Sequence, residues 1–271
     1  MEAILQQVAQ GFRGLPVTDD ARQTAVRHIA QWLTETPVLP YRPQLEWLIA
    51  QQQWSLLLDS FYRVLPFGTG GRRGPVGLGT NRFNTWTLAS SVQGHVMYLR
   101  ERYPNQDITV VIAYDVRVFN DLRGLYARGL PNPLLGMTSR AFAEVAAGVY
   151  TAHGVRVSLL PEAATTYIST PELSFAIRYL HATAGLNISA SHNHPDDNGG
   201  KFYNDRGGQE VPPNDAAMAT QVERVSRLDL IDFAAAKATG LISWIAPDVH
   251  EAYVALNVAQ SLHPTARRAH L

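Results

Sequence analysis

Segments with the character of strands and helices alternate through the middle of the chain, and this order limits the possible folds more than any other feature. Three short apolar runs, rich in β-branched residues or alternating with polar ones, predict buried strands at 108–113, 155–160 and 186–190. A helix is predicted before each of the last two strands, beginning at Thr138 or Ser139 and at Pro171. This order predicts a largely parallel sheet with right-handed crossovers and helices on its faces. We therefore expect an α/β fold with a mixed, mainly parallel sheet flanked by helices.

Residues 1–64 are expected to form a helical N-terminal extension. Asp19 and Asp20 are predicted to cap one helix, and Pro43 suits the first position of another. Both helices carry apolar residues at helical spacing, which is typical of core packing: Ala25, Ile29, Trp32 and Leu33 in the first, and Leu45, Leu48, Ile49, Trp54, Leu57, Leu58 and Phe61 in the second.

The segment 67–74, with the sequence FGTGGRRG, is rich in glycine and arginine. Glycines permit positive φ and let backbone N–H groups converge on an anion, and Arg72 and Arg73 add donors for a phosphate. The spacing matches neither a P-loop nor the dinucleotide-binding glycine pattern. Taken alone, the segment fits an anion site and a flexible surface loop equally well. A helix is expected to follow from Asn84, with its apolar residues on one side.

The chain after the predicted parallel strands divides into a hairpin and a tail. Residues 201–204 and 209–211, joined by Asp-Arg-Gly-Gly, predict an antiparallel hairpin that makes the sheet mixed. The tail from about residue 229 has a helical pattern, and no strand is expected in it. The predicted domains are therefore the extension at 1–64, the α/β domain at 65–228, and a tail at 229–271 that begins a truncated second domain.

A polar loop follows the strand at 186–190 and contains the strongest candidate for a functional centre. The hydroxyl of Ser191 lies just past the carboxyl end of that strand, which is where ligands bind in open α/β sheets. Glycines and polar residues surround it: His192, Asn193, His194, Asp196, Asp197, Asn198 and Lys201. A functional loop is favoured over a merely solvated connection. Asp115 and Arg117 follow the strand at 108–113 and can reach this loop, although an ion pair with a structural role is expected.

Composition excludes several classes of protein. Lys plus Arg and Asp plus Glu each number 23, so no net charge attracts nucleic acid or an anionic membrane. The chain has no cysteine, which rules out disulfides, thiolate metal sites and cysteine nucleophiles. The start lacks the pattern of a signal peptide, and no apolar run approaches the roughly 18 residues that span a bilayer. The expected location is the cytoplasm, with neither a nucleic acid nor a membrane as partner.

Two separated motifs together resemble the first domain of the α-D-phosphohexomutases, in particular the phosphoglucomutase/phosphomannomutase branch with its phosphopentomutase-like relatives. They are FGTGGRRG at 67–74 and Ser189-Ala-Ser-His-Asn193 with Asp197-Asn-Gly199 and Lys201. GQEVPP at 208–213 and the Trp32-Leu33 helix extend the resemblance, which covers roughly residues 30–225. It implies a phosphosugar mutase, an isomerase that moves a phosphoryl group between sugar hydroxyls through a sugar bisphosphate such as glucose 1,6-bisphosphate.

The resemblance also implies roles for individual residues. Ser191 would carry the phosphoryl group, and Lys201 would act as general acid/base or as a fixed positive charge. His192 and Asn193 would shape the catalytic loop. Arg73 would approach that loop, together with phosphate-binding positions at Thr69 and Gly71. Mg²⁺ would be held by the phosphate on Ser191 and by acidic residues of a second domain.

The sequence departs from the family pattern at several points. His194 stands where the family has proline, and Gly200 stands where it commonly has an aromatic residue. The family's later motifs for metal, sugar and phosphate are absent after Lys201. The resemblance therefore implies an N-terminal portion that is inactive alone, with the missing C-terminal domains as its partners and a phosphosugar as its substrate.

Two other hypotheses remain open. His192-x-His194 with Asp196 and Asp197 would suit a metal-dependent hydrolase, although a catalytic zinc site normally needs a third protein ligand and an open position. The chain would alternatively be a non-catalytic phosphosugar-binding module that retains the arginines of the glycine segment.

Overall fold

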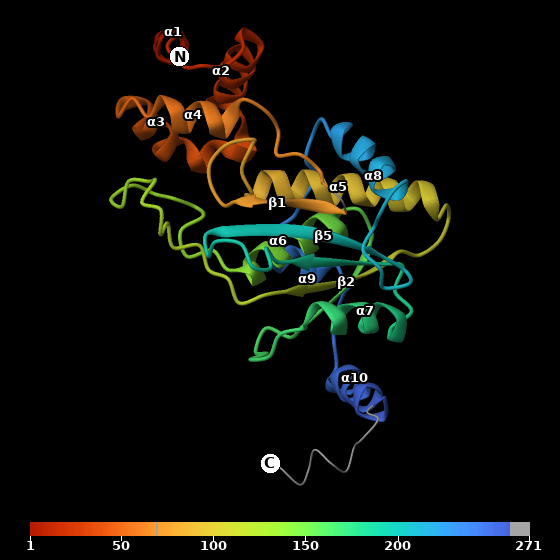
Figure 1. The fold of residues 1–271 in the computed structure, drawn as a ribbon. Coiled ribbons are helices and arrows are strands. Elements are labelled where there is room, and N and C mark those ends of the chain that lie inside the picture. Colours follow the sequence, from red (N-terminus) through yellow and green to blue (C-terminus); the bar gives the residue numbers. More distant parts are fainter. Residues whose placement is uncertain (69, 261–271) are drawn as a thin grey trace.

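The computed structural model describes residues 1–68 and 70–260, and its centre is a six-stranded mixed sheet (Figure 1). The strands lie in the order β1-β5-β4-β2-β3-β6. β4, β2, β3 and β6 are parallel, and β5 is antiparallel to both β4 and β1. The predicted α/β fold with a mainly parallel sheet is confirmed. The strand bounds are β1 Gly71–Pro75, β2 Thr109–Tyr114, β3 Arg156–Leu159, β4 Ala184–Ile188, β5 Asp197–Asn204 and β6 Ile242–Trp244.

Helices cover both faces of the sheet, because its central strands are apolar on both sides. Along β2, Val110 and Ile112 join one hydrophobic core while Val111 and Ala113 join another, as alternate residues of a strand must. The first core contains α5 (Thr85–Arg102) and α6 (Ser139–Ala152), onto which α8 (Asn214–Glu223) and α9 (Phe233–Ala238) pack. The second core contains α7 (Thr170–Tyr179) and α10 (Pro247–Ala259), visible below the sheet in Figure 1.

The N-terminal extension is helical as predicted, and its core is continuous with that of the sheet. Its elements are α1 (Glu2–Phe12), α2 (Asp19–Thr34), a 3-10 turn (Thr36–Tyr41), α3 (Arg42–Ala50) and α4 (Trp54–Phe61). Trp32 packs against Tyr41 and Phe61 with ring centroids 5.0 and 5.5 Å apart. The predicted cap of α2 was wrong by one residue, because Thr18 accepts from the Ala21 N–H while Asp19 and Asp20 lie in the first turn.

Three local predictions were wrong. Residues 71–75 of the glycine segment form the edge strand β1, which pairs with β5 instead of forming a loop. The predicted hairpin at 201–211 was too long: it consists of one antiparallel bridge between Tyr203 and Gln209, since β1 occupies that edge of β5 as far as Lys201. Helix α5 is buried around most of its circumference, not on one side, because the sheet, α6 and α8 enclose it.

The tail contributes to the sheet. β6 pairs in parallel with β3, so the expectation of a tail without a strand was wrong. The domain boundaries at 64/65 and 228/229 stay predictions. Within residues 1–68 and 70–260, none of the helices is both long and apolar enough to cross a bilayer.

Candidate active site

Ser191 lies in the loop between β4 and β5 and is held in an uncommon backbone conformation. Its φ is +57°, in the left-handed region that residues with a side chain rarely adopt, and such strain concentrates at functional sites. Its N–H donates to the Ser189 hydroxyl at 3.0 Å, and its own hydroxyl is exposed, 3.4 Å from Nδ1 of His192. The loop therefore presents Ser191 to solvent, with the His192 imidazole beside its hydroxyl.

Arg117 holds this loop by donating hydrogen bonds to its backbone carbonyls. Its guanidinium Nη atoms donate to the carbonyl oxygens of Ser191 at 2.7 Å and His194 at 2.6 Å, with longer contacts to Asn193, Pro195 and Asp197. Only a guanidinium offers enough donors in a fixed plane for such an array. Arg117 also pairs with Asp115 at 3.1 Å, so the expected ion pair exists and supports the loop around Ser191 as well.

Asp115 links Arg117 to the start of α6. One carboxylate oxygen accepts from the Ser139 hydroxyl at 2.6 Å and from the Arg117 N–H at 3.1 Å. Ser139 in turn accepts from the Asn198 amide at 2.9 Å. Asp115 directly follows the central strand β2, and Asn198 lies at the start of β5, where the loop that contains Ser191 ends. This chain of hydrogen bonds therefore fixes the C-terminal end of that loop to the sheet.

The loop between β4 and β5 (residues 189–196, the serine loop) is also held by the neighbouring loop at 115–138. Asp196 is buried and accepts from the backbone N–H groups of Asn120 and Arg123. Asp197 pairs with Arg123 at 2.8 Å and accepts from the Asn193 amide at 3.1 Å. Both carboxylates named in the metal-hydrolase hypothesis, and the Asn193 side chain, are thus engaged in holding the loop.

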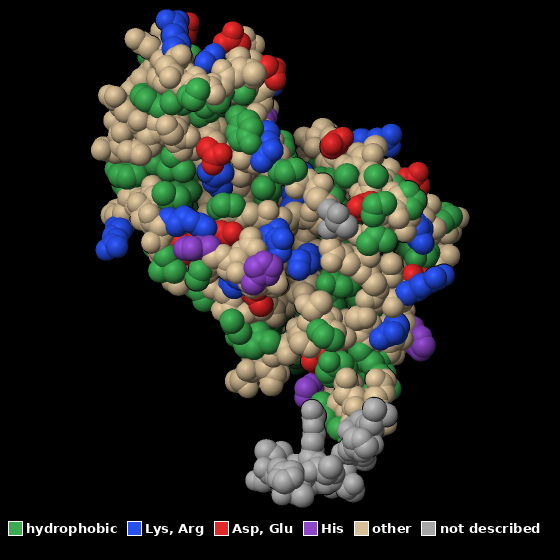
Figure 2. Space-filling view, in the orientation of Figure 1, with side chains coloured by type: hydrophobic (Ala, Val, Ile, Leu, Met, Phe, Trp, Pro, Cys, Tyr) green, Lys and Arg blue, Asp and Glu red, His purple; other side chains and the backbone are tan. Residues whose placement is uncertain are grey.

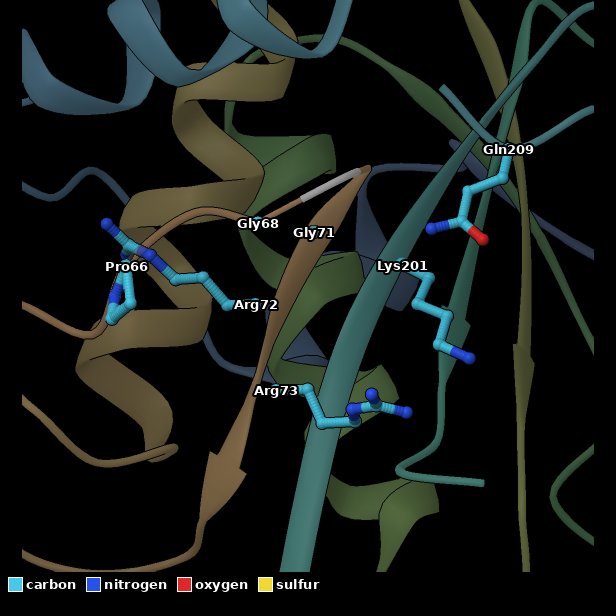
Figure 3. A pocket seen from close by; sticks show the side chains of 7 residues that line it. All are labelled: Pro66, Gly68, Gly71, Arg72, Arg73, Lys201 and Gln209. Carbon is cyan, nitrogen blue, oxygen red and sulfur yellow. The ribbon is translucent and has the colours of Figure 1, made fainter. Parts of the chain in front are cut away.

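Arg73 and Lys201 lie on the same face of the sheet, beside the serine loop. In the strand register Arg73 faces Gly199 and Gly71 faces Lys201, so the two cationic side chains are diagonal neighbours. In Figure 3 the side chains of Arg73 and Lys201 extend to one side of β1, and the side chain of Arg72 extends to the other. They line a cavity of about 500 Å³ with Gly71 and Gln209. The structure therefore brings the predicted Arg73, Lys201 and Gly71 together, whereas Thr69 lies outside the described residues.

Burial and charge both act on Lys201. Partial burial, followed by the nearby charge of Arg73, lowers the pKa of the Lys201 ammonium, while Asp115 opposes the shift. Both causes disfavour the charged form, because each makes an additional positive charge costlier. A lysine with a lowered pKa is better suited to proton transfer than an ordinary surface lysine.

Glycines allow the backbone to approach closely around this cavity. A side-chain carbon at Gly199 would lie 2.9 Å from the Arg72 carbonyl, 3.0 Å from the Ser189 carbonyl and 3.1 Å from Cβ of Arg73. The absence of a side chain at Gly199 therefore lets the backbones of Ser189, Gly199 and Arg73 lie side by side across the sheet. Ser191 follows Ser189 by two residues along the chain. Figure 2 shows basic side chains and histidines gathered near the middle of this view, below the N-terminal helices.

The departures from the family pattern have structural reasons here. His194 replaces proline and braces the loop, since its Nδ1 accepts from the Asp196 N–H at 3.1 Å and its carbonyl from Arg117. Gly200 faces α5, where an added carbon would lie 3.4 Å from the Leu88 side chain, and it stands opposite Arg72. Arg72 and Arg73 both border this cavity, but their side chains leave β1 on opposite sides, because consecutive strand residues alternate between faces.

The residues present offer few ligands for Mg²⁺. Within the described ranges, no group of three or more His, Asp or Glu side chains is arranged to hold a metal ion. A phosphate on Ser191 would supply oxygen, the ligand that Mg²⁺ prefers. The acidic ligands implied by the resemblance are not assembled among the described residues.

Comparison with known proteins agrees with this geometry. The family model for the phosphoglucomutase/phosphomannomutase α/β/α domain I matches residues 137–228. A phosphoglucomutase of Staphylococcus saprophyticus is 33% identical over 196 residues, covering 71% of this chain and 31% of the relative. A phosphopentomutase of Mus musculus is 32% identical over 195 residues, covering 72% and 29%.

Structural similarity leads to the same family. A solved protein of Thermus thermophilus, assigned as a phosphomannomutase, superposes with a TM-score of 0.53 at 27% identity, over 74% of this chain and 37% of that one. The chain spans about a third of the length of the curated relatives it matches. The matching family model and these relatives show that the chain belongs to the α-D-phosphohexomutase superfamily and contains its domain I.

Proposed function

We propose that this chain is the serine-bearing part of a phosphosugar mutase of the phosphoglucomutase/phosphomannomutase type. The observation that carries the proposal is the exposed Ser191 hydroxyl on a strained loop, braced by Arg117, beside a cavity lined by Arg73 and Lys201. Phosphoryl transfer depends on positioning and positive charge more than on covalent chemistry. This part of the chain supplies a nucleophile, a fixed loop and two cations.

In the proposed reaction, phosphoserine 191 transfers its phosphoryl group to a hydroxyl of a sugar monophosphate. The bond from phosphorus to Ser191 Oγ breaks as a bond to the sugar oxygen forms, giving a sugar bisphosphate such as glucose 1,6-bisphosphate. The proton lost by the attacking hydroxyl is balanced by the one that the departing Ser191 Oγ gains, with Lys201 as general acid/base or as a fixed positive charge. His192 lies beside Oγ and shapes that side of the loop. Return of the other phosphoryl group to Ser191 completes the isomerisation and restores the enzyme.

Binding is assigned to the same cavity. Arg73 neutralises phosphate charge there, and Gly71 lines the same cavity. Thr69 is included as a phosphate-binding residue on the family resemblance alone. Asn193 acts through the loop, since its amide is engaged with Asp197. Mg²⁺ bound to the phosphoserine would neutralise charge on the transferring group. The remaining Mg²⁺ ligands and the sugar-reading groups would come from C-terminal domains, and the expected location is the cytoplasm.

A coupled assay on glucose 1-phosphate, with Mg²⁺ and glucose 1,6-bisphosphate present, tests the proposal. The chain alone should turn over little or not at all, since each missing electrostatic contributor costs roughly 100-fold or more. Joined to the C-terminal domains of a relative, it should gain activity that Ser191→Ala abolishes and Arg156→Ala, a distant exposed change, does not. Equal activity of the Ser191→Ala fusion would refute the proposal. Phosphosugar binding to Arg73 and Lys201 without turnover in the fusion would favour the non-catalytic module.

A further inference from the structure

The side chain of Arg72 leaves β1 on the side opposite to that of Arg73 and, besides bordering the active-site cavity, lines a second hollow. Figure 3 shows its side chain leaving β1 in the direction opposite to that of Arg73. The hollow encloses about 240 Å³ between the segment before β1, helix α5 and helix α8. Its lining is largely apolar and includes Pro66, Trp86 and Val222, with Ser90 and Glu223 as polar members.

The guanidinium of Arg72 is hydrogen-bonded along one side only. Nη1 donates to the Thr87 carbonyl at 3.1 Å and to the hydroxyls of Ser90 and Ser91 at 3.0 and 3.1 Å. Among the described residues, Nε is buried without a partner, and Nη2 makes no hydrogen bond. Nε and Nη2 share one edge of the guanidinium plane, and that edge matches the two oxygens of a carboxylate.

The charge of Arg72 is also uncompensated. The side chain is buried, with a relative exposure of 6%, and burial lowers its pKa to about 10. The guanidinium remains charged at neutral pH, so the cost of removing it from water persists. Glu223 opposes the shift from the exposed end of α8, but the two side chains do not form an ion pair within 4.0 Å. A ligand anion would satisfy both the free edge and the charge.

We infer that this hollow binds a small monocarboxylate with an apolar body. The acid group would sit on the Nε/Nη2 edge of Arg72, and the apolar body would lie against Trp86, Pro66 and Val222. The volume is below the roughly 300 Å³ of ordinary ligand sites, which limits the ligand to a small aromatic or branched acid. A phosphate ester suits the hollow poorly, since one cation faces a doubly charged group with Glu223 close by.

Titration with sodium benzoate, followed by ¹⁵N NMR of the whole chain, tests this site. Benzoate should shift the Trp86 indole N–H saturably, while benzyl alcohol, its neutral counterpart, should bind at least tenfold more weakly because the charge-assisted pair is lost. Arg72→Met should weaken benzoate binding at least tenfold. Arg73→Met removes the same charge from the other face of β1, so it should leave benzoate binding unchanged.

A second variant covers the case in which Arg72→Met alters the fold. Glu223 is exposed, so Glu223→Gln should fold normally, and removing its repulsion should tighten benzoate binding severalfold. The inference is overturned if benzoate binds Arg72→Met and the unaltered chain equally, or if benzyl alcohol binds as tightly. It is also overturned if the Trp86 signal does not move at benzoate concentrations in the tens of millimolar.

Discussion

Replacing Arg117 by alanine should loosen the loop that carries Ser191 without unfolding the sheet. The side chain is 12% exposed and donates to five loop carbonyls, of which the shortest bonds reach His194 at 2.6 Å and Ser191 at 2.7 Å. A hydrogen bond from a charged donor contributes about 1.5 kcal/mol or more, but water can replace part of it at a surface loop. We therefore expect loop opening to become easier by about 2 kcal/mol, which corresponds to roughly 30-fold.

Hydrogen exchange read by mass spectrometry measures this change directly. The loop amides of Asn193 and Asp197, which donate to the carbonyls of Ala190 and His194, should exchange roughly 30-fold faster in Arg117→Ala. Peptides from β2 and β4 should keep most of their protection, since their ladder bonds remain. Arg117→Lys should recover only a small part, because an ammonium cannot span the array.

Arg178→Ala is the matched control, since it removes the same charge from α7, where Nε donates to the carbonyl four residues earlier. It should leave exchange in the 189–199 segment unchanged. The reasoning is refuted if Arg117→Ala protects that segment as well as the original residue does. It is equally refuted if protection falls evenly over the whole chain.

Three further changes test other parts of the structure. Burial lowers the pKa of His95 to about 3, so only the unfolded state gains this proton as pH falls below about 6.5. Denaturation measured between pH 7 and 4 should show up to about 1.4 kcal/mol of stability lost per pH unit. His95→Gln should flatten this dependence of the free energy of unfolding on pH. The lowered pKa of Lys201 means that its charge destabilises the folded state. Lys201→Met should therefore raise the thermal midpoint at pH 7, and this gain should shrink as the pH rises through that pKa. A difference in midpoint between the two chains that does not change with pH would contradict this. In Gly94→Ala the new carbon would meet Cα of Val222 at 2.5 Å, so urea unfolding should show a loss of about 1–3 kcal/mol, and an unchanged midpoint would contradict the close α5–α8 contact.

The sheet was predictable because its signals are local. The apolar strand β2, the capped helices after Asn84 and Thr138, and the strand before Ser191 each follow from a few neighbouring residues. Their alternation then determines a parallel sheet by general rules of connection. These elements were correct to within one or two residues.

The errors arose where pairing partners decide the structure. Gly71–Pro75 has little intrinsic strand preference and becomes β1 only because β5 offers a free edge. The short β6 likewise forms against β3, far away in the sequence. Arg72 and Arg73 look equivalent in a loop, but the alternation of a strand sends them to different faces.

The site was only partly predictable for the same reason. Ser191, Arg73 and Lys201 were identified from motifs, whereas the array that holds the loop depends on tertiary contacts. Arg117 was expected to pair with Asp115 and to be able to reach the loop, but its array of contacts with the 191–197 carbonyls was not foreseen, because those residues are more than 70 positions away. The polar side chains just beyond the end of β2 were the available signal.

The central claim is that Ser191 carries a phosphoryl group, and phosphopeptide mapping of the chain purified from cells tests it most directly. Phosphatase inhibitors during purification and intact-mass measurement before digestion would preserve and count the modification. The account predicts one phosphoryl group, located on Ser191 and absent from Ser191→Ala. A chain that remains unmodified even after incubation with glucose 1,6-bisphosphate and Mg²⁺, or that carries phosphate on another residue while Ser191 is free, would contradict it.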